Sequence, residues 1–109
     1  MPNTTLAGPV AKYIAAANTQ DIEAVVATFS ERAVVRDEGQ SWQGIAAIRH
    51  WAVDVSTKYQ PIVETLDVAQ ADGRTLLTGR VAGNFPGSPI NLRYAFTLGG
   101  ERIERLEIS

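Results

Sequence analysis

Two acidic residues follow an apolar run in the segment AVVRDEG, residues 33–39, and they are the first candidates for chemistry. Side chains alternate between the two faces of a strand, so Asp37 shares a face with an alanine and a valine. The other face carries Arg36 and Glu38, which makes it the solvated side. A carboxyl group inside an apolar hollow has a raised pKa, which suits general acid-base catalysis. An aspartate before glycine also commonly accepts backbone N–H groups of a turn, and the pattern alone leaves both interpretations open.

Three helices are predicted around this strand, because apolar residues recur there at three- and four-residue intervals. The first follows Pro9, the second follows Asp21 as its N-cap and runs to Phe29, and the third runs from Gly44 to the helix-breaking Pro61. The apolar positions are Val10, Tyr13, Ile14 and Ala17 in the first helix, Ile22, Val25, Val26 and Phe29 in the second, and Ile45, Ile48, Trp51, Ala52 and Val55 in the third.

The second half changes to the two-residue period of strands. Turn signals at residues 72–73, 86–89 and 99–100 divide residues 62–108 into an antiparallel meander of four strands, and the AVVRDE segment adds a strand upstream. We therefore predict a single α+β domain over residues 1–109. In this class a curved, mainly antiparallel sheet can wrap around the N-terminal helices and leave an apolar hollow.

Composition excludes several classes of function. The net charge is -2 and the arginines are dispersed, which argues against a nucleic-acid partner. The chain has no cysteine and a single histidine, His50, so we expect no metal site and no cofactor. No segment resembles a signal peptide or a run of about 20 apolar residues, so we expect a cytoplasmic protein without a membrane partner.

The order of these elements resembles the nuclear transport factor 2-like superfamily, and within it the ketosteroid isomerase and SnoaL-like polyketide cyclase branches. The segment KYIAAANTQDIEAVVATFSERAVVRDEG, residues 12–39, is similar to the family's two helices and first strand. The segment WQGIAAIRHW, residues 42–51, resembles the glycine-initiated third helix. The later hairpins match in order, so the resemblance covers nearly the whole chain. It implies the family's fold, a cone-like α+β barrel with an apolar pocket.

The resemblance implies roles for two residues. In ketosteroid isomerases, a tyrosine of the first helix donates a hydrogen bond to a developing enolate, and an aspartate of the first strand shuttles a proton; the matching positions are Tyr13 and Asp37. Those enzymes add a neutral acid in a late strand, where the stretch NLRYAFTL offers only Arg93 or Tyr94. The departure argues against steroid isomerisation itself, although a Tyr94 hydroxyl can also donate one hydrogen bond. SnoaL-like cyclases keep the aspartate and vary the rest.

Five further residues are candidates for substrate binding: Phe29, His50, Trp51, Phe85 and Tyr94. Packing in the core is the alternative for the aromatic residues, and for Tyr13 as well. The resemblance places Trp51 on the pocket wall, and alternation places Phe85 near the pocket mouth. His50 lies off the main helical stripe, which predicts an exposed or rim position, and it is a reserve general base.

Three functions follow as hypotheses. The first is a small cofactor-independent isomerase or cyclase that acts on a hydrophobic carbonyl compound by Asp37-mediated proton transfer. The second is a noncatalytic domain that binds a hydrophobic small molecule in the same hollow. The third is a dimerisation domain whose hollow is filled by its own side chains. The resemblance also implies a homodimer that pairs through the outer face of the sheet.

Overall fold

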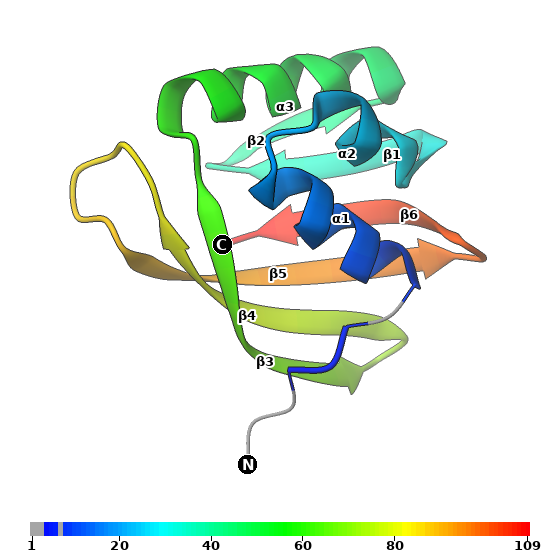
Figure 1. Ribbon diagram of the computed structural model, residues 1–109. Helices are drawn as coiled ribbons and strands as arrows, with labels where there is room; N and C mark the ends of the chain where they lie inside the picture. The colour runs from blue at the N-terminus through cyan, green and yellow to red at the C-terminus, as the bar shows by residue number, and fades with distance from the viewer. Residues whose placement is uncertain (1–3, 7) are drawn as a thin grey trace.

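The computed structural model describes residues 4–6 and 8–109, which form three helices and six strands (Figure 1). In chain order the elements are α1 (Gly8–Asn18), α2 (Ile22–Ala27), β1 (Phe29–Asp37), β2 (Gln40–Gln43), α3 (Ile45–Tyr59), β3 (Ile62–Ala71), β4 (Arg74–Ala82), β5 (Ile90–Gly99) and β6 (Arg102–Ile108).

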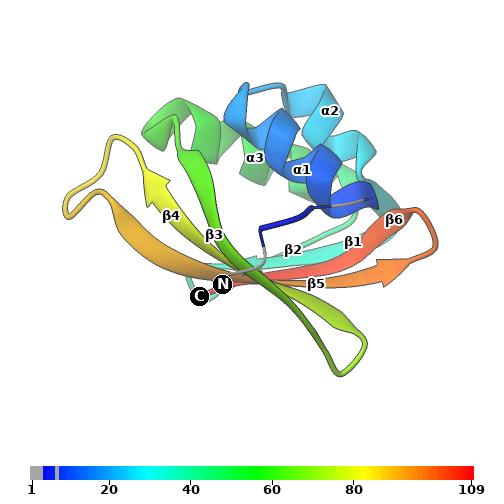
Figure 2. The same ribbon diagram turned by 60° about the horizontal axis from the view of Figure 1, so that its bottom comes forward.

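All six strands belong to one sheet in the order β2-β1-β6-β5-β4-β3. Every neighbouring pair is antiparallel except β1 and β6, which are parallel. The sheet is open and strongly curved, and the three helices lie over its concave face (Figure 2). The predicted α+β class is confirmed, with a mainly antiparallel sheet wrapped around the helices.

The buried core lies between the helices and this concave face. Phe96, Ile103 and Leu106 of the central strands are fully buried there, as is Ile48 of α3. None of the helices in the described part of the chain is long and apolar enough to span a membrane.

The helix predictions hold, with one correction at the end of α2. Asp21 caps α2 as predicted, since its Oδ1 accepts a hydrogen bond from the Ala24 backbone N–H at 3.1 Å. The helix ends at Ala27, however, and Phe29 is the first residue of β1. The Thr28 hydroxyl bonds the Val25 carbonyl at 2.7 Å, which satisfies one of the last carbonyls of α2 as the chain leaves the helix.

Two strand predictions need correction as well. The short strand β2 was not predicted, because its four residues are mostly polar and show no alternation. β4 ends at Ala82, so the pattern that continued to Phe85 belongs partly to a loop. At Gly83 the chain leaves the sheet and docks on the end of α3, where the Asn84 backbone N–H bonds the Tyr59 carbonyl at 2.7 Å.

The α1–α2 connection is tied to the exposed edge of the sheet. Asn18 uses both ends of its side-chain amide on Val63 of β3, donating to the carbonyl at 2.9 Å and accepting from the N–H at 2.8 Å. The Gln20 amide donates to the Pro61 carbonyl at 3.0 Å and accepts from the Ser56 hydroxyl at 2.6 Å. These bonds cover part of the edge strand and fix α1 over the concave face.

Candidate functional site

A cavity of about 280 Å³ lies between the helices and the concave face of the sheet. It is lined mainly by apolar side chains from the three helices and the strands β3 to β6, and the β4–β5 loop contributes Phe85 and Pro86. The hollow is therefore not filled by the protein's own side chains, and the third hypothesis is wrong in that respect.

Among the described residues, the ionisable side chains that line the cavity are three tyrosines and two acids. They are Tyr13, Asp37, Glu38, Tyr59 and Tyr94. No lysine, arginine or histidine of the described chain lines it. The cavity thus offers hydrogen-bond donors and carboxylates but no positive charge to a ligand.

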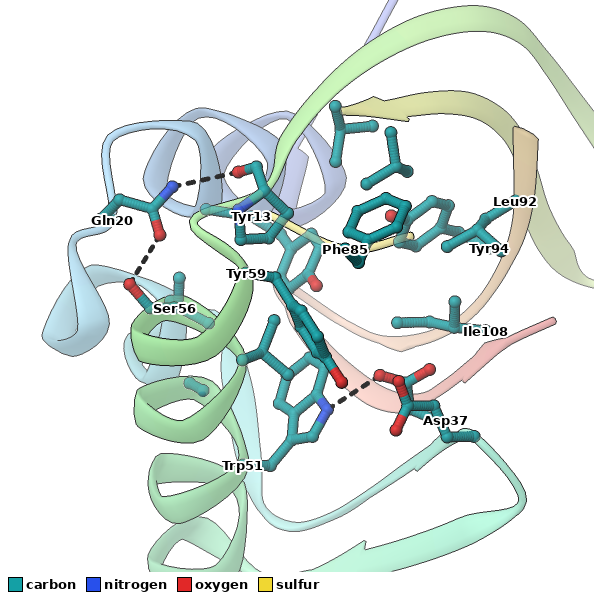
Figure 3. Close-up of a pocket in the computed structure, with 18 of the residues that line it drawn as sticks. Tyr13, Gln20, Asp37, Trp51, Ser56, Tyr59, Phe85, Leu92, Tyr94 and Ile108 are labelled. Atoms are coloured by element: carbon teal, nitrogen blue, oxygen red, sulfur yellow. Dashed lines mark hydrogen bonds between the residues drawn. The ribbon is translucent and has the colours of Figure 1, made fainter. Parts of the chain in front are cut away.

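Asp37 is the last residue of β1 and points into the cavity, on the same face as the buried Ala33 and Val35 (Figure 3). The structure thus places it where strand alternation predicts. Its Oδ2 accepts a hydrogen bond from the indole Nε1–H of Trp51 at 3.1 Å.

The surroundings of Asp37 raise the pKa of its carboxyl above the ordinary value. Burial is the largest cause, because it disfavours the charged form, and the neighbouring charge of Glu38 acts in the same direction. Hydrogen bonds from the Trp51 indole and from the Glu38 backbone lower the pKa and offset part of this effect. The net direction is that expected of a group that exchanges protons.

Glu38 is not confined to the solvated side of the sheet, which corrects the alternation argument. It has a φ of 53°, in the left-handed region, because the chain turns between β1 and β2 at this residue. Alternation applies only while the strand continues. Glu38 remains exposed but borders the cavity beside Asp37.

Tyr13 reaches the cavity from α1 and is only 5% exposed. Its ring packs edge-on against Phe29 and Phe96, with centroid distances of 5.9 and 5.6 Å. Burial, with smaller contributions from Tyr94 and Asp37, raises the pKa of the Tyr13 phenol well above its usual value. The hydroxyl is therefore a neutral hydrogen-bond donor at physiological pH.

Tyr94 reaches the same cavity from the sheet. It lies on β5, opposite Leu77 of β4 and Ile108 of β6, and is 5% exposed. Burial, and then the charge of Asp37, raise the pKa of this phenol as well. Helix α1 and strand β5 thus each contribute one protonated phenol to a cavity that also contains a carboxyl group.

The remaining sequence candidates divide into two groups. Trp51 and Phe85 line the cavity, as the sequence predicts. Phe29 and His50 are not among the residues that line it, so no contact with the cavity supports a binding role for either. Phe29 is 1% exposed and packs in the core behind Tyr13. His50 is exposed on the outer side of α3, because each step of one residue along a helix rotates the side chain by about 100°, which turns His50 away from the direction of Trp51.

Sequence reasoning missed three polar residues that line the cavity: Gln20, Ser56 and Tyr59. Ser56 and Tyr59 continue the spacing of Ala52 and Val55 along α3, so an extension of the helical stripe would have found them. The Tyr59 ring lies edge-on to Phe85 at 5.9 Å, which closes one end of the cavity with the β4–β5 loop. Gln20 has no such signal, because its left-handed φ of 58° places it outside the helical pattern.

No group of three or more histidine, cysteine, aspartate or glutamate side chains in the described residues could hold a metal ion.

Comparisons with known proteins agree with this architecture. The SnoaL-like domain family matches residues 10–101. A Sinorhizobium meliloti protein that carries the provisional name polyketide cyclase is 38% identical, with 95% of each chain covered and a TM-score of 0.91. No curated protein matches the chain.

More distant solved structures share the fold. A Catenulispora acidiphila protein with a ketosteroid isomerase-like fold, solved with trimethylamine, is 17% identical over 96% of this chain and 86% of its own, with a TM-score of 0.83. The epoxide hydrolase/cyclase-like enzyme SalBIII, which has a role in pyran ring formation in the polyether salinomycin, is 22% identical. The match covers 92% of this chain and 85% of SalBIII, with a TM-score of 0.80. Because the family match spans most of the chain and a solved relative covers 95% of it, this protein belongs to the SnoaL-like domain family, within the nuclear transport factor 2-like superfamily.

Proposed function

We propose that this protein is a cofactor-independent isomerase or cyclase that acts on a hydrophobic carbonyl compound. The observation that carries the proposal is that the Asp37 carboxyl and the Tyr13 hydroxyl border one apolar cavity that no cationic side chain of the described residues lines. A neutral carbonyl compound fits such a cavity, whereas an anionic ligand would meet two acids and no positive charge.

In the proposed reaction, the Asp37 carboxylate removes a proton from the carbon next to the carbonyl group. The electron pair of that C–H bond moves to the carbonyl oxygen, which becomes an enolate and accepts a hydrogen bond from Tyr13. In an isomerisation, Asp37 returns its proton to another carbon of the enolate. In a ring closure, the enolate carbon forms a C–C bond with a second carbonyl carbon, whose oxygen takes the proton from Asp37.

The Trp51 indole supports this assignment because it holds one carboxylate oxygen of Asp37. The second oxygen makes no side-chain hydrogen bond within the described residues. A raised pKa makes the carboxylate a stronger base than an ordinary aspartate. Burial thus supplies the basicity and the indole supplies the orientation.

The test is deuterium exchange into 2-tetralone in D₂O, followed by NMR, since this hydrophobic ketone has acidic protons next to its carbonyl. Wild-type protein is expected to exchange these protons faster than buffer. Asp37→Asn should abolish the acceleration, and Tyr13→Phe should reduce it about 100-fold, the usual cost of losing one oxyanion donor. Exchange by Asp37→Asn at the wild-type rate would refute the assignment.

A noncatalytic binding domain is the second candidate, and the mainly apolar lining of the cavity favours it. A structural neighbour with this fold was solved in complex with the small molecule trimethylamine. Saturable binding of a hydrophobic ligand without any 2-tetralone exchange would decide for this candidate.

We also propose that the protein forms a homodimer through the outer face of its sheet. Several residues of that face are apolar or small and only half-buried, namely Val34, Leu76 and Ala95. Light scattering during size-exclusion chromatography should give twice the 11.8 kDa chain mass, and a monomer at micromolar concentration would contradict the proposal. The cytoplasmic location stays a prediction from the sequence.

A further inference from the structure

Two polar residues line the cavity away from Asp37 and have no part in the proposed reaction. They are Gln20, which follows α1, and Ser56 of α3, and both are half-buried. In Figure 3 this pair lies well apart from Asp37. Ser56 follows Trp51, the partner of Asp37, by five residues, which is about 7.5 Å along the axis of α3. The mainly apolar cavity thus has a second polar region, separate from the one that contains Asp37.

The hydrogen bonds of this pair have a fixed direction. The Gln20 amide nitrogen donates to the Pro61 backbone carbonyl at 3.0 Å, and a carbonyl can only accept. The amide oxygen must then face Ser56, whose hydroxyl donates to it at 2.6 Å. A serine hydroxyl has one proton, so that proton is committed to Gln20. Ser56 can therefore offer a ligand only the lone pairs of its oxygen.

The backbone of Gln20 holds this arrangement in place. Gln20 has a φ of 58°, a left-handed conformation that is uncommon for residues other than glycine. Such conformations persist where the surrounding contacts hold them. Here the contacts are the two side-chain bonds and the bond from the Gln20 backbone N–H to the Ala17 carbonyl at 3.1 Å. The Gln20 amide is thus kept in one direction, toward the end of α3.

A purely structural role is the alternative, because the same bonds tie the α1–α2 connection to the edge of the sheet. Asn18 already makes that tie through its two hydrogen bonds to Val63. A serine in a helix can also donate to the carbonyl four residues earlier, but the Ser56 hydroxyl makes no such bond within the described residues. Polar groups on an apolar wall are costly to desolvate unless a ligand meets them with a hydrogen bond. A ligand that displaces water from this wall therefore has to supply a polar group.

We propose that Ser56, held by Gln20, binds a hydroxyl group at the end of the ligand opposite to its carbonyl group. The inference rests on the proposed function, and it narrows the substrate class to hydrophobic hydroxy ketones. The ligand hydroxyl donates its proton to Ser56 Oγ, because the serine proton is already committed to Gln20. A halogen or a methyl group at that position of the ligand donates nothing, so it leaves the Ser56 oxygen without a partner.

The experiment uses 6-hydroxy-2-tetralone and 6-fluoro-2-tetralone, which are similar in size and differ in the hydrogen-bond donor on the ring far from the ketone. Calorimetric titration measures the binding of each compound. The wild type should bind the hydroxy compound about three- to tenfold more tightly, the value of one net hydrogen bond. Ser56→Ala should lose this preference and bind the fluoro compound with unchanged affinity. Thr57→Ala is the matched control, because it removes a neighbouring hydroxyl that is exposed and does not line the cavity, and it should keep the preference.

Three results would overturn the inference: the same preference in Ser56→Ala as in the wild type, an equal loss of affinity for both compounds in that variant, or no preference or no binding by the wild type. The second result would leave Ser56 and Gln20 with a structural role only. The preference is a ratio of two affinities, so partial unfolding of the variant does not change it.

Binding requires no proton transfer, so this experiment and the exchange assay can fail separately. Loss of the preference in Ser56→Ala without any 2-tetralone exchange by the wild type would refute the proposed function alone. Exchange by the wild type with an unchanged preference in Ser56→Ala would refute this inference alone.

Discussion

The hydrogen bond from Trp51 to Asp37 predicts a stability cost that depends on pH. Trp51→Phe removes the indole N–H that lies 3.1 Å from Asp37 Oδ2 and keeps an aromatic ring in the core. The bond lowers the pKa of Asp37, so it is stronger with the carboxylate than with the neutral acid. The cost of the substitution should therefore be larger where Asp37 is ionised.

The magnitude follows from the bond and from the buried area. Hydrogen bonds to charged groups contribute about 1.5–3 kcal/mol, and we take the low end because Asp37 is only partly buried. Replacing an indole that is 4% exposed by a phenyl group costs about 1 kcal/mol more in lost apolar burial. Near pH 8 the substitution should lower the free energy of unfolding by about 2.5 kcal/mol. Near pH 3 this loss should be smaller by roughly 0.7 kcal/mol, because Asp37 is then neutral and charge-assisted bonds are about twice as strong as neutral ones.

Urea unfolding at the two pH values measures this difference. The matched control is Trp42→Phe, since Trp42 packs against Trp51 with a centroid distance of 6.3 Å but makes no hydrogen bond to Asp37. The control should lose the same free energy at both pH values. A cost of Trp51→Phe that is equal at both, or larger in acid, would refute the assignment of the indole to the ionised carboxylate.

Three further predictions concern the surroundings of the site. Because burial raises the pKa of Asp37, the stability of the wild type should fall as the pH rises from the usual aspartate range through the raised pKa. Thermal melts should show this fall for the wild type and not for Asp37→Asn. If the wild type instead gained stability relative to the variant with rising pH, Asp37 would be a structural aspartate. Gly83→Ala should destabilise the fold by about 1–3 kcal/mol in urea unfolding, since a Cβ atom at this position would lie 2.6 Å from the Tyr59 carbonyl oxygen. A variant as stable as the wild type would contradict the docking of this loop on α3. Asn18→Ala should lower the free energy of unfolding by about 1–3 kcal/mol, because it removes the two side-chain hydrogen bonds to Val63. Hydrogen exchange at the Val63 amide should then become faster. An unchanged exchange rate would contradict the role of Asn18 at this edge.

Local periodicity was sufficient to predict the direction of Asp37 and the buried faces of the helices. The two-residue period of β1 turned Asp37 inward, and the helical stripes of α1 and α3 placed Tyr13 and Trp51 toward the same interior. These predictions succeed because burial of one face determines both patterns.

Other features depend on contacts that local patterns do not encode. Phe29 continues the helical spacing of α2, yet its pairing with Ile103 of β6 makes it a strand residue. Glu38 follows the alternation of β1 until a left-handed turn redirects it. The bond between Trp51 and Asp37 joins residues of two layers, and only the packing of α3 on the sheet brings them together.

The parallel pairing of β1 with β6 has a consequence for the timing of folding. β1 lies between β2 and β6 in the sheet, and β6 is synthesised after every other strand. Translation adds about 5–20 residues per second, so residues 29–37 wait several seconds for their partner at residues 102–108. The β3–β4 hairpin is complete at residue 82, but β5 ends only at residue 99, so the rest of the sheet, including the contact between β1 and β6, forms near the end of synthesis. The side of the cavity that contains Asp37 is thus assembled late, from segments that the ribosome releases far apart in time.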